Sequence, residues 1–143
     1  MKAVEGYTGR DSMQTKGSAN SEIERLRQYL KSRSDVSFGM VFGSFARGEE
    51  RKDSDLDVAI FFLEAAVPRG FDVLVLEQKL SDIAGREVDL VILNSVGVFL
   101  RHQIQKNHQM LVLHNKRAYR MYRERTMREY DEYRYLNPEK SYA

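Results

Sequence analysis

The chain contains no cysteine, and this absence excludes disulfides, thiolate zinc sites and cysteine nucleophiles. It also has no apolar run near the roughly 18 residues of a membrane span, and residues 1–20 lack the apolar segment of a secretory signal. Neither sign of charge dominates, since 23 Lys and Arg stand against 21 Asp and Glu. We therefore expect a cytoplasmic protein with no membrane partner and no direct nucleic-acid partner.

A length of 143 residues is enough for one compact domain but not for two. Hydrophobic residues make up 42% and charged residues 31%, which is typical of a globular domain. Residues 1–20 are rich in Gly, Ser and other polar residues without apolar periodicity, and this predicts a disordered tail. The folded domain is then expected at residues 21–136.

Hydrophobic periodicity predicts strands that alternate with helices. The predicted strands cover residues 36–42, 56–63, 87–93 and 110–113, the last of them at a sheet edge. The predicted helices lie in residues 21–34, 68–85, 95–107 and 116–135. Ser21 opens the first helix in a capping box, and Gly85 ends the second. Asn94-Ser95 caps the third helix, which Asn107 ends in a left-handed conformation. This order predicts a small α/β or α+β sheet with helices packed on it.

The last predicted helix carries an aromatic seam at three- and four-residue spacing, formed by Tyr119, Tyr122, Thr126, Tyr130 and Tyr133. Packing against its own domain is the favoured interpretation, and a docking face for a partner is the alternative. The three histidines have no metal-ligand spacing, so no site is assigned to them.

Two aspartates open the second predicted strand. Side chains alternate along a strand, so Asp55 and Asp57 point to one side while Leu56 points into the core. Carboxylates this close repel each other unless a divalent cation neutralises them, and oxygen ligands favour Mg²⁺ or Mn²⁺ over zinc. Asp89 is a carboxylate inside the third, apolar strand, and it joins the pair if these two strands are neighbours.

A Gly-Ser pair ends the first predicted strand. Gly43 permits a close approach of backbone to phosphate, and free N–H groups with the Ser44 hydroxyl can converge on an anion. Arg47 is a candidate for a phosphate contact, although it could equally form an ion pair with Glu49, Glu50 or Asp53.

These residues resemble the signature of a known superfamily. Gly43-Ser44, ten intervening residues and Asp55-Leu56-Asp57 are similar to the motif of the polymerase-beta-like nucleotidyltransferases. Ala46-Arg47-Gly48 resembles the minimal nucleotidyltransferase branch, the MntA-like antitoxins that are partners of HEPN (HepT-type) toxins. The resemblance covers about residues 21–115 and implies an α+β nucleotidyltransferase fold, with a small mixed sheet flanked by helices and a long C-terminal helix.

The same resemblance implies roles for the motif residues. Asp55 and Asp57 would bind two Mg²⁺ ions, with Mn²⁺ as a substitute. Asp89 would be the third carboxylate ligand and the base for the incoming hydroxyl. Gly43 and Ser44 would hold the phosphates of ATP.

The implied function is transfer of AMP from ATP to a tyrosine of a HEPN-domain ribonuclease toxin, in a hetero-oligomer of antitoxin and toxin. Two alternatives stay open. One is a nucleotidyltransferase that modifies a small molecule such as an antibiotic, and the other is an antitoxin that binds without catalysis. The intact carboxylates disfavour the antitoxin that binds without catalysis. The small-molecule enzyme is disfavoured because the short chain leaves little room to enclose a small acceptor.

Overall fold

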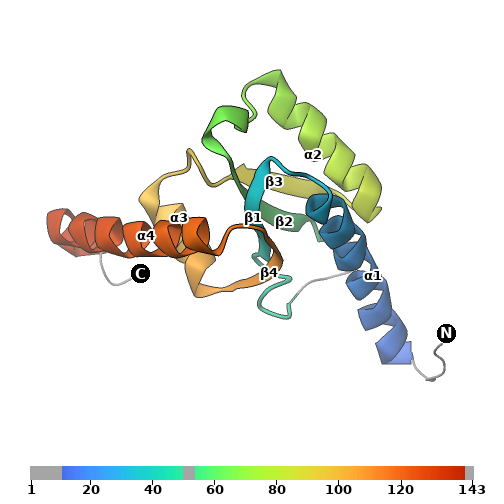
Figure 1. Cartoon of the computed structure of the whole chain (residues 1–143). Helices are drawn as coiled ribbons and strands as arrows, with labels where there is room; N and C mark the ends of the chain where they lie inside the picture. The colour runs from blue at the N-terminus through green and yellow to red at the C-terminus, as the bar shows by residue number, and fades with distance from the viewer. Residues whose placement is uncertain (1–10, 50–53, 141–143) are drawn as a thin grey trace.

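The computed structural model describes residues 11–49 and 54–140 and shows one four-stranded mixed sheet (Figure 1). Its strands are β1 (Val36–Phe42), β2 (Leu56–Phe62), β3 (Val88–Ile92) and β4 (His108–Leu113), in the order β3-β2-β1-β4. β1 is antiparallel to both β2 and β4, whereas β2 and β3 are parallel. All four predicted strands form, and β4 lies at an edge as predicted.

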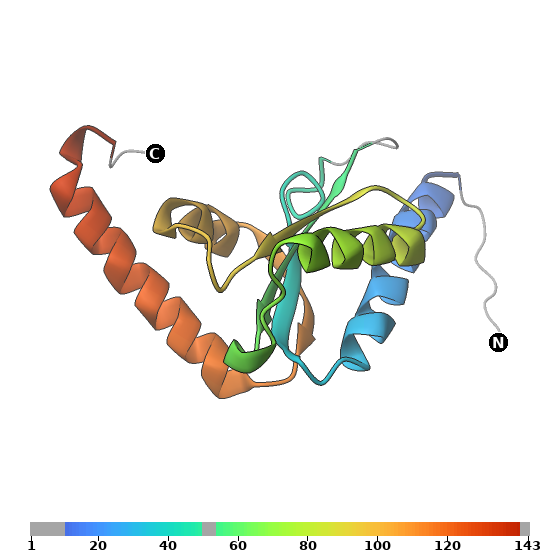
Figure 2. The same ribbon diagram turned by 90° about the horizontal axis from the view of Figure 1, so that it is seen from above.

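Four helices pack on this sheet, two on each face (Figure 2). They are α1 (Asp11–Lys31), α2 (Phe71–Ala84), α3 (Val98–Lys106) and α4 (Lys116–Leu136), and short 3-10 turns lie at Glu64–Ala66 and Pro138–Lys140. No helix within the described ranges is long and apolar enough to cross a membrane. The mixed sheet, the flanking helices and the long last helix confirm the predicted α+β fold.

The two faces of the sheet bury separate hydrophobic clusters. Along β2, Leu56, Val58, Ile60 and Phe62 face α1 and α2, and Ala59 faces α3 and α4. Because strand side chains alternate, Asp57 lies on the same face as Ala59. On β3 the same alternation places Asp89 on the face of Val91, which packs in the α3/α4 cluster. The fold therefore sets both carboxylates on the α3/α4 side of the sheet.

The predicted start of the first helix is wrong. α1 begins at Asp11, so Ser21 lies inside it, and residues 11–20 are helical where a disordered tail was predicted. Residues 1–10 lie outside the described residues. Leu26 and Leu30 are fully buried, and a helix anchored by such packing extends at little cost because nucleation is the expensive step. Hydrophobic periodicity detects only the second half of α1, which contains the buried leucines.

The predicted start of the third helix is wrong, and although Asn107 ends α3 as predicted, its left-handed conformation is not found. Gly97 precedes α3 without a side-chain cap, and the Asn94 side chain instead bonds the backbone of Phe62, with both contacts at 2.9 Å. Asn107 is extended, with φ −144° and ψ 99°, because the next residue, His108, already pairs with Phe42 in the sheet. By contrast, the predicted end of α2 is confirmed, since Gly85 is left-handed at φ 74°.

Candidate active site

The three predicted carboxylates lie on two neighbouring parallel strands. Asp57 is paired with Asp89 in the register of β2 and β3, and Asp55 directly precedes β2. The first residue of β2 is hydrogen-bonded to the residue that precedes β3, since the Leu56 N–H donates to the Glu87 carbonyl at 2.9 Å. The structure thus fulfils the condition set by the sequence, that the second and third strands must be neighbours.

The electrostatics of the cluster are those of crowded negative charge. Partial burial raises the pKa of Asp57, the nearby Asp89 and Asp55 carboxylates raise it further, and Arg47 opposes them. Burial likewise raises the pKa of Asp89, together with the charges of Asp55 and Glu77 and a hydrogen bond with Asp55. The carboxyls of Asp57 and Asp89 therefore hold their protons more tightly than an isolated aspartate does.

The donor set fits a magnesium ion that takes its other ligands from a substrate. Within the described part of the chain, no three His, Cys, Asp or Glu side chains already converge closely enough to form a complete ion site. Magnesium in proteins is commonly bound by one or two carboxylates while phosphates and water complete its octahedron. Hard oxygen donors with raised pKa values match such a cation, because its charge relieves their repulsion.

The Gly-Ser turn lies against the carboxylates. β1 ends at Phe42, which pairs with Asp57, and Gly43 follows with φ 73°. The turn is closed by hydrogen bonds from Arg47 N to Gly43 O at 3.2 Å and from Glu49 N to Ser44 O at 2.8 Å. The structure therefore brings Gly43 and Ser44 to the same end of the strands as the aspartates.

Arg47 forms an ion pair with Glu49, from Nε to Oε1 at 3.0 Å. Both side chains are exposed, so the pair contributes less than about 1 kcal/mol and is readily exchanged for another anion. The other two predicted ion-pair partners, Glu50 and Asp53, lie outside the described residues. The phosphate contact of Arg47 stays a prediction.

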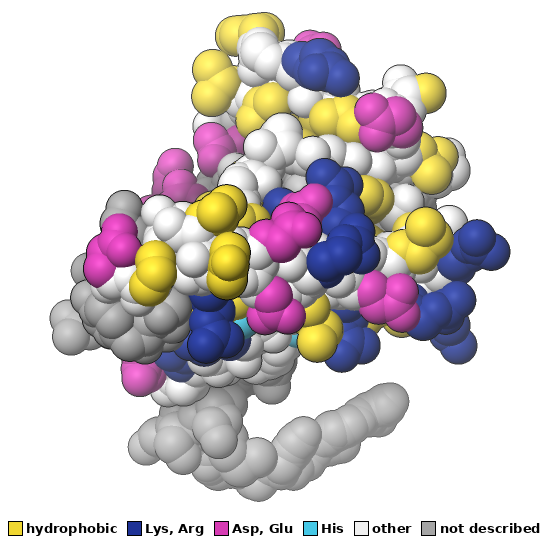
Figure 3. All heavy atoms as spheres, turned by 90° about the vertical axis from the view of Figure 1, so that its left-hand side faces the viewer, with side chains coloured by type: hydrophobic (Ala, Val, Ile, Leu, Met, Phe, Trp, Pro, Cys, Tyr) yellow, Lys and Arg dark blue, Asp and Glu magenta, His cyan; other side chains and the backbone are white. Residues whose placement is uncertain are grey.

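The tyrosine seam of α4 packs against its own domain, which confirms the favoured interpretation. Tyr122 and Tyr130 are buried, and Thr126 is fully so. Tyr119 and Tyr122 contact Phe38 of β1, with ring centroids at 5.0 and 5.3 Å. The outer surface of the molecule on this side mixes Lys and Arg with Asp and Glu around single hydrophobic side chains (Figure 3).

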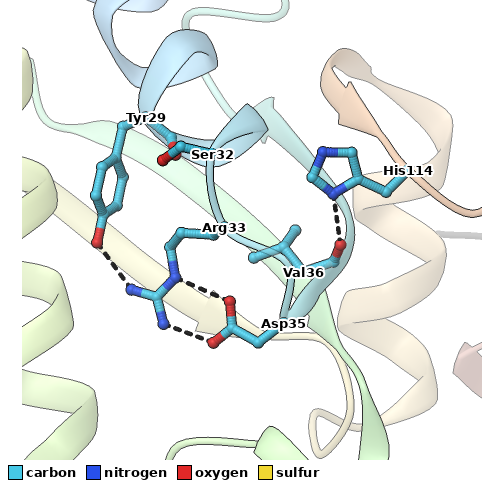
Figure 4. A network of polar contacts seen from close by, with 6 residues as sticks. All are labelled: Tyr29, Ser32, Arg33, Asp35, Val36 and His114. Carbon is cyan, nitrogen blue, oxygen red and sulfur yellow. Dashed lines mark hydrogen bonds and ion pairs between the residues drawn. The ribbon is translucent and has the colours of Figure 1, made fainter.

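The histidines serve separate local contacts. His102 stacks on Tyr130 with ring centroids 3.5 Å apart, and His108 contacts the Tyr119 hydroxyl. His114 Nδ1 lies 2.8 Å from the Val36 carbonyl, beside the ion pair of Arg33 and Asp35 that ends the α1–β1 connection (Figure 4). None of these contacts lies among the three aspartates.

One residue at the site was missed by the sequence analysis. Glu77 of α2 accepts a hydrogen bond from Leu90 N at 2.8 Å, and its charge contributes to the raised pKa of Asp89. Glu77 is an ordinary helical glutamate twelve positions before Asp89, and nothing in the local pattern marks it. Only the packing of α2 beside β3 reveals it.

A mixed sheet that carries paired aspartates beside a Gly-Ser turn defines the class of nucleotidyltransferase folds. The polymerase beta nucleotidyltransferase family matches residues 24–117, and the chain belongs to this family. It is similar to the protein adenylyltransferase MntA of Thermococcus cleftensis, with 37% identity over 79 residues that cover 52% of this chain and 78% of the relative. A Methanocaldococcus jannaschii protein with a provisional protein adenylyltransferase name is 33% identical over 96 residues, covering 66% of this chain and 96% of that protein.

Solved structures share the fold. A toxin-antitoxin crystal structure with AMP-PNP superimposes with a TM-score of 0.70 at 21% identity, covering 82% of this chain and 92% of that one. A tri-AMPylated Shewanella oneidensis HEPN toxin in complex with MNT antitoxin gives a TM-score of 0.65 at 19% identity, with the same coverage. At these identities the likeness establishes the fold alone.

Proposed function

We propose that this chain is a protein adenylyltransferase antitoxin, which transfers AMP from ATP to a tyrosine hydroxyl of a HEPN-type ribonuclease toxin and so neutralises it. The observation that carries the proposal is the pairing of Asp57 with Asp89 in the register of β2 and β3. Asp55 and the Gly43-Ser44 turn lie at the same end of these strands. The relatives named as protein adenylyltransferases support the choice of a protein acceptor.

In this proposal each site residue has a defined task. Asp55, Asp57 and Asp89 would hold two Mg²⁺ ions, or Mn²⁺ in their place. When bound, these ions neutralise the triphosphate and polarise its α-phosphate. Gly43 and Ser44 hold the β- and γ-phosphates. The N–H groups of residues 47 and 49 close the turn, so the backbone donors to phosphate come from residues 43–46.

The transfer exchanges the α–β phosphoanhydride bond of ATP for a phosphoester bond to the tyrosine oxygen. The tyrosine oxygen bonds to the α-phosphorus, the bond from that phosphorus to the α–β bridging oxygen breaks, and pyrophosphate leaves. Asp89 accepts the hydroxyl proton as the general base. Arg47 adds a charged contact to the phosphates, because its surface pair with Glu49 costs little to break.

A protein acceptor suits the open site of a single small domain, since a partner surface can complete it. A bulky AMP group adds negative charge to the toxin, and charge of that sign near an RNA-binding groove repels the RNA backbone. On α4 the seam is buried, so docking falls to the exposed surface of this helix, where Met121 and Met127 are each 53% exposed.

Co-expression with the HEPN-type partner and intact-mass measurement of that partner test the proposal. We expect one or more AMP additions that disappear with Asp55→Asn and persist with Asp82→Asn, a matched change at an exposed position on α2, which packs on the other face of the sheet from α4. Full neutralisation by Asp55→Asn, with no mass change in the wild-type pair, would establish binding without catalysis instead. Labelled AMP on a small molecule but not on the partner would establish the antibiotic-type alternative.

A further inference from the structure

The strand that carries Asp89 lies at a sheet edge, with β2 on one side and α2 along the other (Figure 1). Backbone N–H groups on a free strand edge need other partners. Two side chains of α2 supply them. Ser81 Oγ accepts from Val88 N at 2.9 Å, and Glu77 accepts from Leu90 N at 2.8 Å.

The spacing of these two acceptors matches the strand. Residues four apart on a helix are separated by about 6 Å along its axis, and residues two apart on a strand by about 6.6 Å. Glu77 and Ser81 therefore contact the N–H groups on both sides of Asp89, and Ser81 Oγ is itself held by the Glu77 carbonyl at 3.0 Å. The backbone of Asp89 is fixed by β2 on one edge and by α2 on the other.

We propose that Glu77 is a positioning residue for Asp89. Its carboxylate holds Leu90 N–H, and this contact fixes the segment that sets the Asp89 carboxylate opposite Asp57. The role rests on the proposed function of the aspartates.

Two substitutions separate the hydrogen bond from the charge. Glu77→Gln keeps an acceptor oxygen for Leu90 N–H and removes the charge, whereas Glu77→Ala removes both. Gln78→Ala is the control, because Gln78 is an exposed neighbour on α2 whose side chain contacts only Asp82 among the described hydrogen bonds.

We expect Glu77→Ala to lower kcat for AMP transfer about 10- to 100-fold, the usual effect of removing a supporting contact to a metal ligand, while KM for ATP changes little. Glu77→Gln should recover most of kcat, and Gln78→Ala should match wild type. Hydrogen exchange at the Leu90 amide should accelerate in Glu77→Ala and stay slow in Glu77→Gln. Impairment of Glu77→Gln equal to that of Glu77→Ala would overturn the proposal.

A second readout does not depend on transfer. Titration with Mn²⁺ alone, followed by the electron paramagnetic resonance of the free ion, should show weaker binding in Glu77→Ala than in Glu77→Gln. If wild type transfers no AMP, the proposed function fails while this comparison still tests the placement of Asp89. Equal Mn²⁺ affinity and equal Leu90 exchange in the Ala and Gln variants would refute the positioning role.

Discussion

Gly43 lies directly against the carboxylate of Asp57. A Cβ built on Gly43 would overlap Asp57 Oδ2 and would stand 3.1 Å from Asp57 Cγ. Glycine is therefore required at position 43 for two reasons. Its φ of 73° is unfavourable for other residues, and the Asp57 side chain leaves no room for a Cβ. The phosphate turn and the central aspartate are in this way one packed unit.

Gly43→Ala should abolish AMP transfer, because the new methyl group must displace either the turn or the Asp57 carboxylate. The left-handed backbone adds a loss of stability of about 1–2 kcal/mol. The control is Gly48→Ala, since Gly48 has φ 74° but a Cβ added there would meet no atom within 4 Å. We expect both variants to lose stability in urea, Gly43→Ala by more because of its clash with Asp57, and we expect loss of transfer in Gly43→Ala alone. Similar transfer rates for the two variants would show that the contact with Asp57 is unimportant.

Asp57→Asn should stabilise the metal-free protein at neutral pH. Burial and neighbouring carboxylates raise the pKa of Asp57 in the folded state, so its ionisation opposes folding. This cost to the free energy of folding is absent below the pKa of the unfolded state. It grows as the pH rises from that pKa through the folded pKa. After solvent screening we expect a gain of about 0.5 kcal/mol at pH 7 that disappears near pH 3. Thermal melting in chelator at both pH values measures it, and a gain confined to acid would contradict the sign.

The sequence predicts those parts of the fold that depend on repeated local chemistry. Apolar runs indicated the four strands, and alternation within β2 placed Leu56 in the core beside two outward aspartates. The pairing of Asp57 with Asp89 needed one further fact, the adjacency of β2 and β3. Periodicity cannot supply that fact because it carries no information on strand order.

The wrong predictions for Asn94 and Asn107, at the two ends of the third helix, share a physical cause, which is tertiary competition for a local signal. Asn94 has the side chain of an N-cap but bonds to the Phe62 backbone instead, where it extends the sheet. Asn107 tolerates a left-handed conformation, but the immediate start of β4 requires an extended one. Glu77 was missed for the same reason, since its partner Leu90 is distant in sequence.

Asp35→Asn should destabilise the protein by about 1–2 kcal/mol at pH 7, because Asp35 accepts two hydrogen bonds from Arg33, at 3.0 and 2.6 Å. These bonds hold the pKa of Asp35 below its usual value. Such stabilisation is present above the unfolded pKa and is lost as the pH falls through the folded pKa. Urea unfolding at pH 7 and pH 3 should therefore show a difference between wild type and variant only at pH 7. Asp131→Asn, at an exposed position on α4, should show no difference at either pH.

Divalent metal should be required for tight ATP binding. The aspartates should favour ATP binding when metal is present and oppose it when metal is removed. With Mg²⁺ or Mn²⁺, Asp55→Asn and Asp57→Asn lose ligands and should bind ATP at least about tenfold more weakly than wild type. In excess chelator the same carboxylates repel the triphosphate, so both variants should then bind ATP more tightly than wild type, although all bind weakly. Calorimetric titration of the three proteins with and without chelator measures both differences. Unchanged wild-type affinity in chelator would show that the triphosphate binds elsewhere, whereas weaker binding by the variants in both conditions would mean that the aspartates contact the nucleotide directly. A change of sign is the result expected of carboxylates that meet ATP through a cation.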